Sequence, residues 1–342
     1  MYINWAHHYI PKISGFCSII VNFIFIYILQ DDKQNKLGGY RHLLLFFAFY
    51  NLTCTVLDVL VPLAVHDHHY AFSAFTGHGL FEKNSELGAV MLSFRCSLVP
   101  ATYAILHAHF VYRYLAVFAH KFLIKYFIPY GLLLTLLHCL VLMAGWFFAC
   151  YYYLAVDPER SIYLEKSFRE TFNVSVFDLN VIGALYREAS SETISKSWSG
   201  ILILSFISVN SVIILFILSA LIIKNLRKME FQMSKTTQKM QKQLMKALTV
   251  QAVILLFVSF TPCLVTLYQP VFNINLGSWI SYSSCIAISF FPVLDPLALF
   301  YFIPTFRRRI KEAVTGKPEK MIAYIMSSRV NQSSSDVESH VQ

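Results

Sequence analysis

Two full charges stand inside apolar stretches of this chain, where a charge is costly. Asp58 lies 16 residues past His42, at which one apolar stretch begins, and Arg95 lies 18 residues before Arg113, at which another ends. If both stretches are helices, a rise of about 1.5 Å per residue places the two charges roughly 24 and 27 Å above the same side. An unpaired charge in the middle of a membrane costs about 2.5–3.5 kcal/mol. We therefore expect Asp58 and Arg95 to pair.

The guanidinium of Arg95 gives this pair a chemistry beyond packing. A guanidinium in a pocket favours ligands that carry a carbonyl or a carboxylate group, because it donates charge-assisted hydrogen bonds to them. The alternative is a purely structural role, since a buried ion pair often does no more than secure packing. Both interpretations remain open from the residues alone.

Four lysines precede another apolar stretch at helical spacing. Lys235, Lys239, Lys242 and Lys246 are separated by four, three and four residues, which places them on one face of a helix. This face either contacts a protein partner or is a solvated face near anionic lipid headgroups.

No metal or cofactor is expected. The seven cysteines form no CxxC pair and no metal-ligand spacing. The histidines do not offer three ligands and an acid at one depth, which a membrane metal hydrolase would need.

The elements that position these residues follow from composition. Hydrophobic residues make up 56% of the 342 residues, against roughly 45–50% in soluble domains. Charged residues make up 14%, against about 25%. The mean hydropathy is +0.55. A soluble enzyme and a disordered chain are both poor interpretations of such a chain, and a membrane protein is expected.

Seven stretches are long and apolar enough to span a bilayer, which needs about 20 residues each. The sequence therefore predicts an all-α membrane protein, a seven-helix transmembrane bundle over residues 1–303, followed by a largely disordered tail at 304–342. The expected helices lie near 13–29, 42–65, 88–112, 127–150, 198–223, 247–268 and 279–303, with a long outer loop at 151–197.

The loop charges orient the bundle. Twenty lysines and arginines lie in three connections and the tail on one side, against six on the other side. Because the cytoplasmic side carries the excess of Lys and Arg, the N-terminus is outside and the C-terminus is cytoplasmic. The basic residues are segregated by the bilayer in this way, so no nucleic-acid partner is expected. Of the three sequons, at Asn51, Asn173 and Asn331, only Asn173 lies in an outer loop, and it is the expected glycosylation site.

Several motifs resemble those of rhodopsin-like receptors. Tyr112-Arg113-Tyr114 is similar to their Asp-Arg-Tyr element with Tyr in place of the acid, and Asp295-Pro296 is similar to their Asn-Pro element. Across essentially all seven stretches, the chain more closely resembles the nematode serpentine chemoreceptors of class r and its sister class j. The resemblance is carried by NWAHHYIPKISG, GGYRHLLLFFA, FVYRYLAV, KMQKQLMKALTVQ and PVLDPLALFYF.

This resemblance implies a chemosensory G-protein-coupled receptor in the plasma membrane, in the sensory cilia of chemosensory neurons. It implies two partners, a small odorant or water-soluble ligand and a heterotrimeric G protein. The residues expected to contact the G protein are Arg113, Tyr114, Lys239, Lys242 and Lys246. Pro262, Asp295 and Pro296 are expected to form the activation switch, with Pro262 as a hinge.

In rhodopsin-like receptors the level of Arg95 faces the ligand cavity. We therefore expect Asp58 and Arg95 to form the floor of an outer pocket. Its expected walls are Tyr103, Phe260, Leu267, Tyr282 and Cys285.

Three alternatives accompany this interpretation. Arg113 could be an anchor that snorkels to the lipid headgroups. An odorant-gated cation channel would favour a cytoplasmic N-terminus, which the loop charges oppose, and a seven-helix membrane hydrolase needs the metal site discussed above. One departure from rhodopsin-like receptors is also clear: the 151–197 segment contains no Cys. No disulfide between that segment and the third helix is expected, so other contacts must hold it.

Overall fold

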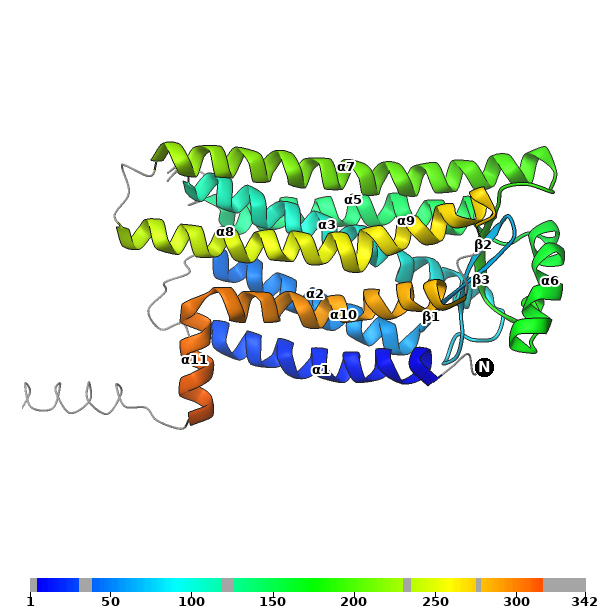
Figure 1. Cartoon of the computed structure of the whole chain (residues 1–342), viewed down its shortest axis with the longest axis horizontal. Helices are drawn as coiled ribbons and strands as arrows, with labels where there is room; N and C mark the ends of the chain where they lie inside the picture. The colour runs from blue at the N-terminus through cyan, green and yellow to red at the C-terminus, as the bar shows by residue number, and fades with distance from the viewer. Residues whose placement is uncertain (1–4, 31–38, 118–125, 230–234, 275–277, 316–342) are drawn as a thin grey trace, which may run out of the picture.

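A computed structural model describes residues 5–30, 39–117, 126–229, 235–274 and 278–315 of the chain. Within these residues, seven helices are long and apolar enough to cross a membrane. They lie side by side in one bundle (Figure 1). Because lipid offers no hydrogen-bond partner, the backbone of each apolar stretch satisfies its own polar groups as helix. The expected seven-helix membrane fold is confirmed.

The helices differ in regularity. The first three are α1 (Trp5–Gln30), α2 (Tyr40–Leu60) and α3 (Glu86–Val117). The fourth consists of η1 (Phe127–Gly131), α5 (Leu132–Phe148) and η2 (Ala149–Tyr153), in which both flanking pieces are π-helical. The fifth is α7 (Ser191–Met229). The sixth consists of α8 (Lys235–Leu255), the π turn η4 (Leu256–Phe260) and α9 (Thr261–Tyr268), followed by the short 3-10 helix η5 (Gln269–Phe272). The seventh is α10 (Ser278–Phe302).

The second helix ends earlier than expected. It was predicted to reach Val65, but α2 stops at Leu60, and Val61 has φ −130° and ψ 71°. The cause is Pro62, which has no N–H to donate and disfavours the helical conformation in the residue before it. The chain then continues as a strand.

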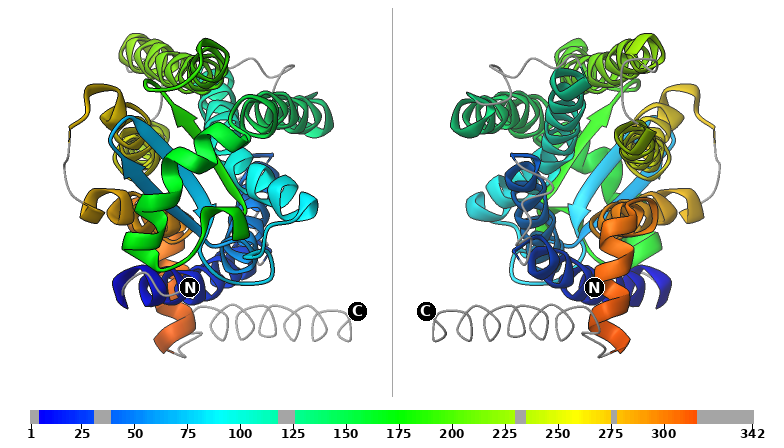
Figure 2. Two further views of the ribbon diagram at one scale, coloured as in Figure 1. Left: turned by 90° about the vertical axis from the view of Figure 1, so that its right-hand side faces the viewer. Right: turned by 90° about the vertical axis from the view of Figure 1, so that its left-hand side faces the viewer.

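A three-stranded antiparallel sheet caps the outer end of the bundle. The strands β1 (Leu63–His68) and β2 (Ala71–Thr76) form a hairpin, and β3 (Val181–Leu185) pairs with β2. Figure 2 shows the sheet across the end of the bundle with α6 (Pro158–Phe172) lying over it. The expectation of a loop at 151–197 is therefore wrong, because this segment folds into η2, α6, a 3-10 turn at Val176–Asp178, β3 and the start of α7.

The sheet is apolar on both faces, which explains its position between two layers. Successive side chains of a strand point to opposite faces. Phe72, Ala74 and Ile182 pack toward the bundle, whereas Ala71 and Phe75 pack against Phe168 and its neighbours on α6.

A buried arginine joins the parts of this cap. Arg160 of α6 is 2% exposed, and its Nη2 donates to the carbonyl of Thr193 at 3.2 Å and to Ser197 Oγ at 3.0 Å, both at the start of α7. Ser197 Oγ in turn accepts from the backbone N–H of Leu185 in β3 at 2.9 Å. All seven cysteines are free. Polar contacts of Arg160 therefore hold the segment that a disulfide holds in rhodopsin-like receptors.

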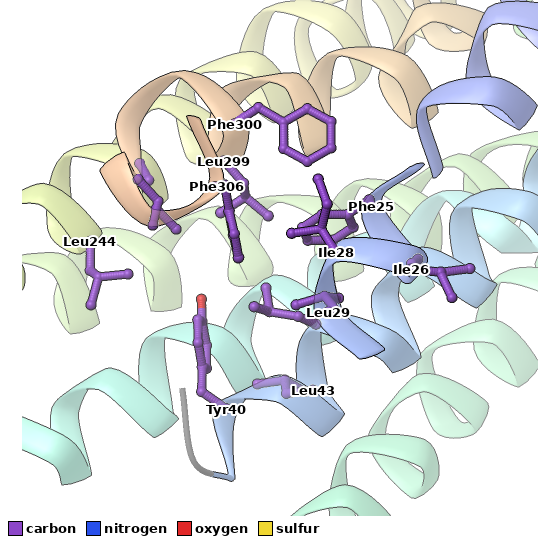
Figure 3. Close-up of a cluster of buried hydrophobic side chains, with 14 of the residues drawn as sticks. Phe25, Ile26, Ile28, Leu29, Tyr40, Leu43, Leu244, Leu299, Phe300 and Phe306 are labelled. Atoms are coloured by element: carbon purple, nitrogen blue, oxygen red, sulfur yellow. The ribbon is translucent and has the colours of Figure 1, made fainter. Parts of the chain in front are cut away.

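A further helix lies beside the inner ends of α10 and α1, at one edge of the bundle (Figure 1). The helix α11 (Pro304–Thr315) turns away from α10 (Figure 1), and Arg309 Nη1 donates to the carbonyl of Ile28 in α1 at 2.8 Å. Phe306 packs against Phe25 and Phe300 in an aromatic cluster at this end (Figure 3). The tail predicted from residue 304 onward as largely disordered thus begins as helix, and residues 316–342 lie outside the described part of the chain.

We predict that Asn173→Gln abolishes a glycosidase-sensitive mobility shift of the receptor expressed in microsomes or cells. Asn173 is exposed and ends α6 on the outer cap in a left-handed conformation (φ 57°), where a glycosylating enzyme can reach it. Ser175→Thr is the matched control, because it keeps both the sequon and the hydroxyl that caps the following turn. A shift that survives Asn173→Gln would contradict the assigned orientation.

Candidate functional site

The ion pair expected between the second and third helices is present. An Nη2 hydrogen of Arg95 in α3 is donated to Asp58 Oδ1 in α2. The side chains are 6% and 14% exposed, so the pair lies inside the protein. Neither charge is therefore left unpaired in a low-dielectric environment. The prediction of this pair was based on that cost.

A cavity lies beside this pair in the outer half of the bundle, directly beneath the sheet. Its volume is about 70 Å³. The sheet forms its roof through Phe72, Ala74 and Ile182, and Trp146 and Leu204 contribute to its walls. Arg95 is its one charged lining residue among those the structure describes. The arrangement is that of an apolar chamber with the Arg95 side chain in its lining.

The remaining polar groups of the chamber are weak or already bonded. Thr266 donates from Oγ1 toward the carbonyl of Pro262 at 2.8 Å and lies 3.1 Å from Ser284 Oγ. Four thiols line the chamber, and buried thiols act as small apolar groups. They belong to Cys96, Cys150, Cys263 and Cys285. The chamber therefore suits a small, mostly apolar molecule with one hydrogen-bond acceptor.

The predicted pocket residues divide into two groups. Arg95, Leu267 and Cys285 line the chamber as expected, and Asp58 contacts it through Arg95. Tyr103, Phe260 and Tyr282 do not line this cavity.

The reasons differ from residue to residue. Tyr103 is fully buried in a deeper apolar cluster. It lies eight residues after Arg95 along α3, and therefore closer to the inner side. Phe260 ends the π turn η4, which changes the direction of the residues beside it relative to a regular helix. Tyr282 lines a separate polar pocket at the outer surface together with His66 and Glu170.

The roof residues are the part of the site that the sequence did not reveal. The strands that carry them are six, six and five residues long and lie next to far longer apolar stretches. The available signal was the pair of turn residues His69-Tyr70 between Leu63–His68 and Ala71–Thr76, with His69 at φ 47°. That signal is weak in the sequence alone.

At the inner end, Arg113 is held by aromatic rings. Its Cζ lies 3.9 Å from the centre of the Tyr40 ring, and the rings of Tyr40 and Tyr112 stack with centroids 5.1 Å apart. The Tyr40 hydroxyl lies 3.0 Å from His109 Nδ1. Arg113 is 6% exposed, so it is packed inside the bundle instead of extended toward lipid headgroups. Figure 3 shows the Tyr40 side chain pointing from the start of α2 into the inner apolar cluster.

A polar network links four helices midway along the bundle. Asp295 of α10 is 1% exposed and accepts from Gln251 Nε2 of α8 at 2.7 Å. Asn22 of α1 donates to the carbonyl of Pro292 at 2.9 Å, and Asn51 of α2 donates to Asn22 Oδ1 at 3.4 Å. The predicted switch residues Asp295 and Pro296 therefore lie next to a direct link between the sixth and seventh helices.

The other predicted residues lie on or near the sixth helix and the inner side. Pro262 follows the π turn η4, whose wider winding accommodates the proline ring. Lys239, Lys242 and Lys246 are exposed on α8, which begins at Lys235, so the predicted helical extension is present. Tyr114 is half-buried against the deeper apolar cluster.

In the described part of the chain, no group of three or more His, Cys, Asp or Glu side chains is placed to hold a metal ion.

Comparison with known proteins decides the family. Residues 1–310 match the family model described as serpentine type 7TM GPCR chemoreceptor Srj. The chain belongs to this family. It is 37% identical over 307 residues to serpentine receptor class J-38 of Caenorhabditis elegans, which covers 90% of this chain and 93% of that one. It is 26% identical over 320 residues to serpentine receptor class r-10 of the same organism, with 91% of each chain covered.

A solved structure supports the fold. The crystal structure of squid rhodopsin superposes with a TM-score of 0.59 at 12% identity, covering 91% of this chain and 85% of the rhodopsin chain. The chain is thus a multi-pass membrane protein with the fold of G-protein-coupled receptors. The family and the fold are those of receptors, which are not enzymes.

We predict that Arg95→Met destabilises the receptor by about 3–5 kcal/mol, because it leaves Asp58 buried without its cation. The double variant Asp58→Leu/Arg95→Met should cost much less than the sum of its single changes. Thermal unfolding of purified protein in detergent measures both. Lys166→Met is the control, since the Lys166–Glu170 pair on α6 is exposed and such pairs contribute about 0–1 kcal/mol. Additive effects of the two substitutions in the pair would contradict the prediction.

Proposed function

We propose that this serpentine receptor is a chemosensory receptor whose ligand occupies the chamber beneath the sheet. The observation that supports this most directly is the apolar cavity beneath the sheet, which has Arg95 in its lining. At about 70 Å³ it is less than half of the ~150 Å³ apolar cavity that holds benzene in another protein. The ligand class we propose is a small environmental molecule of a few heavy atoms, with an apolar body and one carbonyl or carboxylate group.

The proposed output is activation of a heterotrimeric G protein at the inner end. Between the inner parts of α7, α8 and α10 lies a groove of about 420 Å³, lined in part by Arg227, Lys242 and Lys246. An apolar groove with a basic rim suits the insertion of a partner segment. We place Arg113 at the centre of this response, released from Tyr40 when the inner ends of the helices separate.

The sixth helix is the proposed link between the two ends. Its outer part contributes Cys263, Thr266 and Leu267 to the chamber, and its inner part carries Gln251 and the basic face. Pro262 and the π turn η4 lie between these parts, where a helix bends most easily. A ligand that moves Leu267 would therefore tilt the inner part of the helix. The proposed location is the plasma membrane of chemosensory neurons, in their sensory cilia.

We predict that the charge swap Asp58→Arg/Arg95→Asp reaches the cell surface but changes ligand preference. The swap keeps an ion pair between α2 and α3, yet it places a carboxylate where the chamber now has a guanidinium. Short-chain ketones and acids that activate the wild type should lose potency by tenfold or more, and amines of equal size should gain.

The measurement is a second-messenger dose–response in heterologous cells, after screening small ketones, acids, alcohols and amines for an agonist. Surface labelling confirms expression of each variant. If the swapped receptor responds as the wild type does, the pair has a structural role only and the ligand role of Arg95 is wrong.

We predict that Tyr40→Leu raises ligand-independent signalling several-fold, whereas Tyr40→Phe leaves it near the wild-type level. The Leu variant removes the ring under Arg113, and a desolvated cation–π contact contributes about 2 kcal/mol. The Phe variant keeps the ring. Arg113→Ala should remove ligand-evoked signalling at unchanged surface expression.

Tyr130→Leu is the control for loss of an aromatic ring, since Tyr130 is exposed on the fourth helix away from Arg113. Full signalling by Arg113→Ala would remove Arg113 from the proposed mechanism and leave it a role in packing against Tyr40.

A further inference from the structure

A second cavity lies on the opposite side of the Asp58–Arg95 pair. Its volume is about 240 Å³, and it is bordered by α1, α2, α3, α10 and the segment that carries His78 between β2 and α3. Arg95, Leu63, Cys285 and Ile288 line both this cavity and the chamber beneath the sheet. The ion pair therefore forms part of the partition between the two. We refer to the second cavity as the α1 cavity.

Five of the thirteen residues that line the α1 cavity are basic. His7, His8 and Lys12 come from α1, and His78 and Arg95 face them from the other elements. Among the described lining residues, Asp58 is the one acid, and its carboxylate already accepts from Arg95. The helix α10 contributes Cys285, Ile288 and Ser289, which carry no charge.

The basic groups lie close to one another. Lys12 Nζ is 2.9 Å from His8 Nε2, and because an ammonium group only donates, this ring nitrogen accepts. The rings of His8 and His78 have centroids 5.1 Å apart. His7 Nε2 lies 3.2 Å from the carbonyl oxygen of Leu63, which orients its ring beside the same space. The geometry gathers donors and positive charge around one polar volume.

The electrostatic consequence is visible at His78, which lies outside the membrane-spanning helices. Burial, together with the positive charge of Lys12 and with His8 and His7, lowers the pKa of His78 to about 4. The environment thus disfavours an additional positive charge. An anion in the cavity would raise the pKa of His78, since an opposite charge within a few ångströms favours the charged form of the imidazole.

We propose that the α1 cavity is a second binding site, distinct from the chamber, for an anionic oxygen group such as a carboxylate or a phosphate. Lys12 and His78 bind the anion directly, and the ion pair with Arg95 offsets the negative charge of Asp58 in the lining. The site takes a soluble acid or the headgroup of an acidic lipid of the outer leaflet, which share this chemistry. Its occupancy is independent of the proposed signalling function and is measured without it.

The first test is the thermal stability of the purified full-length receptor in maltoside micelles, which contain no anionic group. Sodium butyrate is titrated at constant ionic strength, with butyramide as the neutral probe of the same size. A ligand that binds the folded state raises the unfolding temperature in a saturable way. We expect saturation with butyrate and no rise with butyramide.

Variants assign the effect to the cavity. Lys12→Gln/His78→Gln should raise the half-saturating butyrate concentration at least tenfold. The matched control is His42→Gln/Lys83→Gln, which removes the same two residue types from exposed positions outside the cavity and should leave the titration unchanged. If the double cavity variant proves unstable, Lys12→Gln alone tests the site, because Lys12 is exposed at its rim. Equal titrations for cavity and control variants, or an equal effect of butyramide, would overturn the proposal.

The pH dependence gives a second readout. Bound anion raises the pKa of His78, so binding takes up a proton and becomes tighter as the pH falls through that raised value. Butyrate should therefore bind more tightly at pH 6.0 than at pH 7.5, with the carboxylate still ionised at both. The difference should shrink in His78→Gln. An unchanged pH dependence in that variant would remove His78 from the site.

A short-chain phosphatidate added to the micelles distinguishes the two sources. If it raises the half-saturating butyrate concentration in the wild type but not in the double cavity variant, a lipid headgroup occupies the same site. If it has no effect on the butyrate titration that the cavity variants abolish, the site is for soluble acids. Both results support an anion site in the α1 cavity.

Discussion

The ion pair between Asp58 and Arg95 is the constraint on which the outer half of this receptor depends. Pairing lowers the cost of placing two charges inside a membrane protein, because an isolated buried charge is expensive. Their pairing fixes the level at which α2 lies against α3, and it also divides the space between the helices into two cavities with one shared guanidinium. Any ligand that attracts Arg95 from either side competes with Asp58 for it. The same interaction therefore has a part in packing and in the partition between the cavities, and it is the centre of the proposed ligand recognition.

The cap above the pair is also held by the packing of apolar surfaces and by one buried arginine, but here the arginine donates hydrogen bonds to neutral groups. A sheet placed across the mouth of the bundle needs an apolar partner on both faces, and the bundle and α6 supply them. The polar ends of these layers are joined by Arg160, which reaches the carbonyl of Thr193 and the hydroxyl of Ser197. With hydrogen bonds in place of a disulfide, the roof is held by contacts that can exchange. This suits the proposed entry of a ligand into the chamber, because the roof covers the chamber in the conformation described here.

Much of the fold was predictable from the sequence, and the parts that were not have identifiable physical causes. Hydrophobic length gave the seven helices, loop charge gave their orientation, and the cost of buried charge gave the Asp58–Arg95 pair. The sheet was missed because its strands are short and adjoin long apolar stretches. The alternation of side chains between the two faces of a strand is therefore hard to recognise in the sequence. Phe260 was expected in the lining, but a π turn precedes Pro262, and extrapolation along a regular helix fails at such a turn. Tyr103 was expected there because residue type suggested a pocket wall and depth along α3 did not enter the argument.

The two ends of the receptor also constrain each other energetically. A molecule small enough for the chamber makes few contacts, and even the best small ligands gain at most about 1.5 kcal/mol per heavy atom. Only the part of that free energy that differs between two conformations can shift their populations. In the proposed mechanism, the contact that holds the inner end must therefore contribute only a small free energy. A cation–π contact of about 2 kcal/mol between Arg113 and Tyr40 meets this requirement, whereas a fully buried ion pair, costing about 3–5 kcal/mol to break, would not. The Tyr that stands before Arg113 in place of an acid is consistent with this requirement, since no carboxylate at that position competes with the aromatic ring for the guanidinium. In the proposed mechanism, the strength of the contact between Arg113 and Tyr40 is thus matched to the small size of the chamber.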